Sequence, residues 1–101
     1  MLALDRLRAA DFTPLLHRAF RLPMGELSLS LELLEVRENK RPAQTPEQRA
    51  PFSLTFKAAP AQPVLAPRMY RLEEETLGAL DLFISPFRAD ADGCYYEAIF
   101  N

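Results

Sequence analysis

The sequence predicts a mainly β domain at the margin of the α+β class: a small antiparallel barrel or sandwich of about six strands with one short N-terminal helix. Apolar and polar residues alternate with period two in several segments. The stretch from Leu77 to Asn101 reads as a hairpin, because two apolar runs flank a polar break that holds Asp92-Gly93. A chain of 101 residues that is 49% hydrophobic forms one domain, residues 1–101.

The N-terminal segment predicts the helix. Apolar residues between positions 2 and 18 recur at spacings of three and four. A proline inside a helix loses a hydrogen bond, so we place Asp11 at the N-cap, the helix at 12–18 and Pro14 in the first turn. An alternative puts Thr13 at the N-cap and Pro14 at the first helical position.

Alternation then predicts the strands. The longest alternating run, 27–38, follows a tight turn at Gly25-Glu26 and changes phase at Leu33-Leu34. A strand changes face only at an extra residue, so we expect a β-bulge or sharp bend there, with both leucines buried on different faces. The last strand carries large groups on both faces, so it is central or covered by the helix. The predicted strands are 20–24, 27–38, 52–57, 68–72, 80–84 ending before Pro86, and 94–100.

Two proline-rich connections link these strands. Residues 39–51 hold three prolines and almost no large apolar group, which predicts a mobile surface loop. Shortening that loop should change stability by less than about 1 kcal/mol. Residues 58–67 form an extended connection in which Val64 and Leu65 are our candidates for an exposed pair that contacts a partner. The alternative is that both residues cap the barrel end.

The charge balance limits the classes of partner. With 26% charged residues and a net charge of −2, no electrostatic reason exists to expect nucleic acid or an anionic membrane. No twenty-residue apolar run spans a membrane, and no secretory signal is evident. We therefore expect synthesis in the cytoplasm, with a later place in a particle left open. The aromatic residues are better explained by core packing than by base stacking.

The inventory for catalysis is nearly empty. His17 is the one histidine, and no nucleophile signature accompanies it, so we interpret it as a polar group near a helix end. Cys94 follows a glycine and lies near acidic residues rather than in an electropositive setting, which favours a small core residue. Three glycines far apart form no phosphate cradle. We predict no enzyme, no catalytic residue and no cofactor.

Two acidic segments were weighed as binding sites. Asp90-Ala91-Asp92-Gly93 faintly resembles a calcium loop, but the remaining ligands at the required spacing are missing. Turn chemistry explains the same four residues, so we predict no metal. Glu73-Glu74-Glu75 is either an acidic docking patch or a solvated turn.

Several short stretches resemble a family of small bacterial proteins of unassigned function. The stretches are Ala10-Asp11-Phe12, Phe20-Arg21-Leu22, Phe52-Ser53-Leu54, Met69-Tyr70-Arg71-Leu72 before Leu77-Gly78, Leu82-Phe83-Ile84-Ser85-Pro86 and Tyr96-Glu97-Ala98-Ile99-Phe100-Asn101. Arg8 departs from the pattern, where a small hydroxyl residue is expected. The family is associated with genes for phage-tail-collar-like proteins. The resemblance implies a component or assembly helper of a phage-tail-like system and carries over no functional residue.

Three functions follow as hypotheses. The first is a structural or protein-interaction module with a protein partner, and self-association is possible. The alternative is a small-molecule-binding β-barrel module with its ligand in the barrel mouth. An enzyme is the weakest hypothesis.

Overall fold

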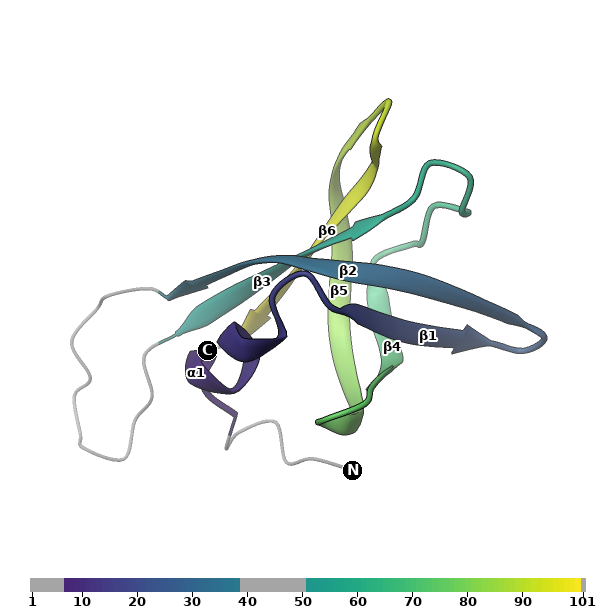
Figure 1. Ribbon diagram of the computed structural model, residues 1–101. Helices are drawn as coiled ribbons and strands as arrows, with labels where there is room; N and C mark the ends of the chain where they lie inside the picture. The colour runs from purple at the N-terminus through teal and green to yellow at the C-terminus, as the bar shows by residue number, and fades with distance from the viewer. Residues whose placement is uncertain (1–6, 39–50, 101) are drawn as a thin grey trace.

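Six antiparallel strands close into a barrel in the order β1-β2-β3-β6-β5-β4 (Figure 1). The computed structural model describes residues 7–38 and 51–100, so the predicted loop at 39–51 lies outside the described residues except for Pro51. The predicted mainly β class is confirmed, and the architecture is the barrel rather than the sandwich. The strands are β1 (Ala19–Met24), β2 (Leu27–Glu38), β3 (Phe52–Ala58), β4 (Arg68–Glu74), β5 (Gly78–Asp90) and β6 (Gly93–Phe100).

The helix begins earlier and is shorter than the sequence predicts. It is α1 (Ala9–Phe12), followed by the 3-10 turn η2 (Thr13–Leu15), and both predicted versions, with Asp11 or Thr13 at the N-cap, are wrong. Asp11 lies in the first turn, where its carboxylate accepts a hydrogen bond of 2.8 Å from the Arg8 amide. The Thr13 hydroxyl donates to the carbonyl of Ala9 at 3.1 Å. Both polar side chains therefore satisfy backbone groups within α1, and the proline falls in η2.

The barrel interior is filled by large side chains. Phe20 and Phe56 meet edge to face, with ring centroids 5.2 Å apart. At one end, Phe12 of α1 packs on the stacked rings of Phe52 and Phe100, at 5.8 Å and 5.5 Å. The helix thus closes one end of the barrel. The predicted alternative, in which the helix covers the outer face of β6, is wrong. The largest fully buried side chains are Tyr96, Phe12, Phe20, Phe56, Leu22, Leu31, Leu33, Leu54, Leu72, Leu80 and Ile84.

Two β-bulges interrupt the ladders. The register of β2 against β3 shifts between Leu33 and Glu35, which confirms the predicted bulge. Leu33 is fully buried, whereas Leu34 is only half-buried, so the expectation that both leucines are buried was too strong. A second shift lies between Pro86 and Arg88, where β5 runs on to Asp90 instead of ending before Pro86. A bulge accommodates a residue that lacks an amide hydrogen, and that is how the strand continues.

The connection between β3 and β4 is tied to the barrel by side-chain hydrogen bonds. The Leu65 amide donates to the hydroxyl of buried Tyr96 at 2.9 Å, and Leu65 is only 4% exposed. The Tyr70 hydroxyl donates to the Ala66 carbonyl at 2.8 Å. A buried hydroxyl needs a hydrogen-bonding group, and the Tyr96 hydroxyl finds it in the Leu65 amide, which holds this segment against the core. Leu65 is therefore not accessible to another protein. Val64 is exposed, so the two residues do not form one exposed pair.

Little of the sheet edge is left open. One residue pair, Arg21 with Glu73, closes the barrel between β1 and β4, and their side chains form an ion pair. Beyond the end of β3, the Gln62 carboxamide accepts from the Ser30 amide at 2.9 Å and donates to the Ser30 carbonyl at 3.0 Å. Gln62 thereby takes the place of a neighbouring strand on β2, so little of this strand's edge is open to a partner strand.

Candidate functional site

The residues first considered for catalysis lie apart from any reactive arrangement. The His17 side chain is 71% exposed, and its Nδ1 lies 3.2 Å from the Glu32 carboxylate. Cys94 is buried in β6, opposite Ala58 of β3. No hydrogen bond or ion pair between the described residues joins His17 to Cys94. Among the described residues, His17 contacts the Glu32 carboxylate but no nucleophile, so the pairing of nucleophile and base that nucleophilic catalysis requires is not seen there.

The two acidic segments serve the turns. The Asp90 carboxylate accepts from the Asp92 amide at 2.9 Å, as an Asx turn does. Within residues 7–38 and 51–100, no three His, Cys, Asp or Glu side chains are grouped to hold a metal ion. Glu74 is buried and accepts from the amides of Thr76 and Leu77 at 2.7 Å and 2.8 Å. Since Glu73 pairs with Arg21, only Glu75 of the three glutamates is left as a solvated charge.

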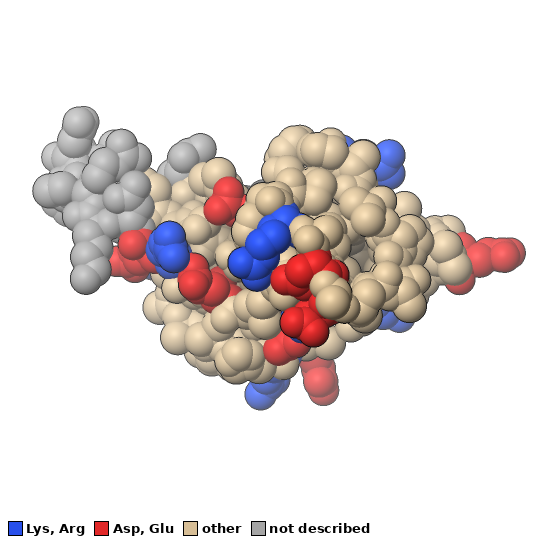
Figure 2. All heavy atoms as spheres, turned by 90° about the horizontal axis from the view of Figure 1, so that it is seen from above, with Lys and Arg blue, Asp and Glu red and all other residues tan. Residues whose placement is uncertain are grey.

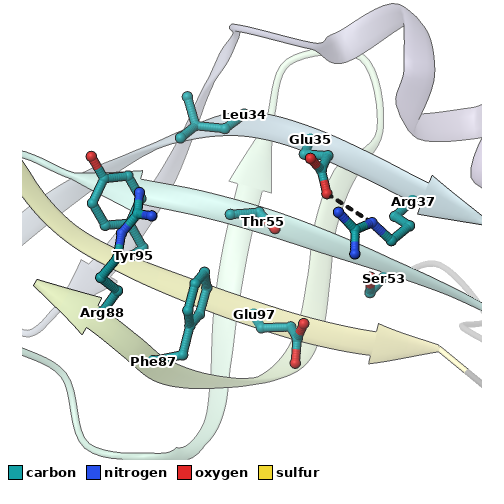
Figure 3. A pocket seen from close by; sticks show the side chains of 9 residues that line it. All are labelled: Leu34, Glu35, Arg37, Ser53, Thr55, Phe87, Arg88, Tyr95 and Glu97. Carbon is teal, nitrogen blue, oxygen red and sulfur yellow. Dashed lines mark ion pairs between the residues drawn. The ribbon is translucent and has the colours of Figure 1, made fainter.

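A hollow on the outside of the barrel is the strongest candidate site. It crosses β2, β3, β6 and β5 and has a volume of about 380 Å³ (Figure 3). Both bulge residues border it: Leu34 from β2 and Phe87 from β5. Bulges frequently re-aim a side chain beside a functional site. We call this surface the outer hollow; its lining residues are Leu34, Glu35, Arg37, Ser53, Thr55, Phe87, Arg88, Tyr95 and Glu97.

Small side chains on β3 create the outer hollow. Ser53 and Thr55 face outward from β3, opposite Ile99 and Glu97 of β6. On the other side of β6, Glu97 lies opposite Ser85 of β5. Glu97 therefore stands between two small cross-strand neighbours, Thr55 and Ser85. The residue is half-buried.

Most charges in the outer hollow are already paired. The Arg37 guanidinium lies 3.2 Å from the Glu35 carboxylate (Figure 3). The Arg88 guanidinium stacks over the Tyr95 ring at 4.1 Å from its centroid, with its Nε 3.9 Å from the Asp90 carboxylate. For Glu97, no hydrogen bond or ion pair joins its side chain to another residue in the described part of the chain. Within the described ranges, the half-buried Glu97 carboxylate is thus left without a counterion.

Exposed apolar side chains lie on and beside part of the border of the outer hollow. Phe87 is 55% exposed, and its ring lies 6.4 Å from that of Tyr95. Ile99, the next outward residue of β6 after Glu97, is 64% exposed. The sequence pattern does not reveal this site, because the predicted strand ends before Pro86 and the prediction assigns Phe87 to no element. The phase slip at Leu34 was the one available signal.

A second depression, of about 470 Å³, lies beside the edge of β2 that Gln62 covers. It is bordered by Glu32, which pairs with His17, and by Lys57. Ala59, Pro60 and Gln62 of the β3–β4 connection line this depression, and no β-bulge residue borders it.

The wider surface shows no field of a single sign on the face drawn in Figure 2. Acidic and basic side chains are interspersed there over a largely uncharged surface. No helix in the described residues is both long and apolar enough to cross a membrane.

Comparison with known proteins gives a family but no activity. The chain matches a domain of unknown function, DUF6916, over residues 7–100. Neither a curated protein nor a solved structure matches it. The match covers all six strands and the helix that plugs the barrel. The resemblance to a family of unassigned function is thus confirmed, and the chain belongs to the DUF6916 family.

Proposed function

We propose that this protein is a structural or protein-interaction module that binds its partner through the outer hollow. The observation that carries the proposal is the position of the two bulges. Each bulge adds one residue to a strand, and both added side chains, Leu34 and Phe87, border the same surface. An exposed aromatic side chain beside a hollow is the usual anchor of a protein interface.

The packing of the barrel argues against the alternative of a ligand in the barrel mouth. Tyr96, Phe20 and Phe56 are fully buried inside the barrel, and Phe12 plugs one end against the stacked rings of β3 and β6. A small-molecule site needs an enclosed pocket with convergent polar groups. The outer hollow is a surface depression shared by four strands, which suits a protein segment better than a small molecule.

The opposite face is a poorer candidate. On β4 and β5, Met69 and Phe83 are cross-strand neighbours and both are exposed. The adjacent cross-strand pair, Arg71 with Asp81, forms an ion pair at 3.1 Å, which raises the pKa of the Arg71 guanidinium. This face therefore offers apolar area without an unpaired charge.

The biological setting that we propose is a bacterial phage-tail-like assembly, in which the protein is a component or an assembly helper. Support comes from the resemblance of the quoted stretches to proteins encoded near phage-tail-collar-like genes. An apolar rim with mixed charges suits assembly with a protein, and the net charge of −2 gives no reason to expect nucleic acid.

The test compares two phenylalanines of β5. Phe87 and Phe83 are 55% and 54% exposed, so Phe87→Glu and Phe83→Glu remove matched apolar areas. Tagged wild-type protein and both variants are used for pull-downs from the native cell, and their unfolding midpoints are measured first. We expect one stoichiometric partner with the wild type and with Phe83→Glu, and its loss with Phe87→Glu.

Other outcomes count against the proposal. Retention of the partner by a folded Phe87→Glu variant removes the outer hollow as the contact surface. Loss of the partner with Phe83→Glu alone moves the contact to β4 and β5. Val64→Asp tests the exposed residue of the β3–β4 connection in the same experiment, and loss of the partner there would locate the contact on that connection.

A further inference from the structure

Glu97 lines the outer hollow, and its carboxylate has no counterion among residues 7–38 and 51–100, which indicates the chemistry of the partner. We infer that the outer hollow binds an arginine side chain that lies between apolar residues of a partner segment. This inference rests on the proposed function, because it names what the partner brings to the same surface.

Charge complementarity selects a cation. Arg37 is neutralised by Glu35 at 3.2 Å, and Arg88 is held by the Tyr95 ring and faces Asp90 at 3.9 Å. An acidic partner residue would find no free cation among these side chains and would be repelled by Glu97. A basic partner residue would pair with a carboxylate that is half-buried, where an ion pair is stronger than on an open surface.

The aromatic rim favours a guanidinium over an ammonium group. A guanidinium is planar, so it can donate two parallel hydrogen bonds to one carboxylate and stack on an aromatic ring. The surface already holds one such arrangement, since Arg88 stacks on Tyr95 at 4.1 Å from the ring centroid. Phe87 offers a second exposed ring on the border of the same hollow. An incoming guanidinium can thus contact Glu97 and Phe87 together.

Exposed apolar side chains beside Glu97 indicate that the partner's arginine is flanked by apolar residues. Ile99 lies two residues after Glu97 on the outer face of β6 and is 64% exposed. Leu34 and Phe87 border the hollow from β2 and β5. Apolar residues next to the arginine would cover these side chains and exclude water from the ion pair, as the ring of contacts around an interface hot spot does.

The experiment uses two short peptides as probes. One is an acetylated tripeptide amide with arginine between two leucines, and the other has neutral citrulline in place of arginine. Isotope-labelled protein is titrated with each peptide, and the backbone amide shifts of Thr55, Ser85 and Glu97 are followed. We expect saturable shifts with a dissociation constant on the order of 1 mM for the arginine peptide and binding about fivefold weaker for citrulline.

Two glutamine variants separate contact from general electrostatics. Glu97→Gln should weaken the arginine peptide about fivefold and leave the citrulline peptide unchanged. Glu75→Gln removes the same charge from the turn between β4 and β5, away from the outer hollow, and should change neither affinity.

Equal affinity of the two peptides, indifference to Glu97→Gln, or an absence of saturable shifts in the hollow would each overturn the inference. The pull-down result stays independent of this test. If Phe87→Glu loses the partner in the pull-down while the protein binds both peptides equally, the arginine inference is refuted and the proposed function stands. A partner retained by Phe87→Glu refutes the proposed function itself.

Discussion

The backbone at Gly93 gives the sharpest test of the barrel geometry. Gly93 follows the two-residue turn of the β5–β6 hairpin and has φ +147°, a conformation that favours glycine. A Cβ atom at this position would overlap the carbonyl oxygen of Ala58 and come within 3.2 Å of its carbonyl carbon. Ala58 faces Cys94 in the last pair of the ladder between β3 and β6, so the clash would push two strands apart.

Gly93→Ala should therefore lower the free energy of unfolding by about 2–5 kcal/mol, from backbone strain together with one or two weakened ladder hydrogen bonds. Gly25→Ala is the matched control. Gly25 also has positive φ, at +59°, but no atom lies within 4 Å of its Cβ position. Strain alone should cost that variant about 1 kcal/mol.

Both variants are compared with the wild type by urea unfolding at neutral pH, and a change in midpoint with unchanged slope measures the loss. The difference between the variants then reports the steric clash with Ala58 together with the larger backbone strain at φ +147°. Equal losses for Gly93→Ala and Gly25→Ala would refute the close approach of the hairpin to Ala58.

Two further predictions concern the bulge and the buried tyrosine. Leu33→Ala should cost about 2–5 kcal/mol and Leu34→Ala about 1 kcal/mol or less, because only Leu33 is fully buried; equal losses in urea unfolding would contradict the bulge. Burial raises the pKa of Tyr96 from 10.0 to about 12, so the stability that its neutral hydroxyl contributes is present below pH 10 and is lost between pH 10 and 12. The difference in free energy of unfolding between the wild type and Tyr96→Phe should therefore narrow between pH 10 and 12. A difference that stays constant over this range would contradict the raised pKa of Tyr96.

Most of the strands could be predicted because they carry a two-residue period over much of their length. The bulge at Leu33-Leu34 was predictable for the same reason, since the period slips there by one residue. The hairpin signal at Asp92-Gly93 also holds, with Asp92 in the turn and Gly93 at positive φ. Local pattern is sufficient where the chain alternates between a buried and an exposed face.

The errors occur where a distant residue decides the outcome. Leu65 is buried because its amide donates a hydrogen bond to the hydroxyl of Tyr96, which is distant in the sequence. The helix boundary depends on which backbone groups the Asp11 and Thr13 side chains bind, here the Arg8 amide and the Ala9 carbonyl. Either residue type could also act as an N-cap. The proline at position 86 predicts the end of a strand, but a bulge lets β5 continue past it. The outer hollow requires the register of four strands, which no single segment encodes.

The residues that the two bulges add lie on the outer surface of the barrel and are not part of its core. Without the extra residue in β2, Glu35 would fall on the inward-facing alternation and Val36 on the outer face. The bulge at Leu34 lets Val36 pack against the core and keeps Glu35 outside, and the bulge in β5 leaves Phe87 outside the ladder. The residues that border the outer hollow are therefore not needed to fill the barrel, so substitutions at Phe87 change the surface offered to a partner at little cost in folding. This separation makes surface variants of this barrel informative about binding, because a lost contact is not confounded with a lost fold.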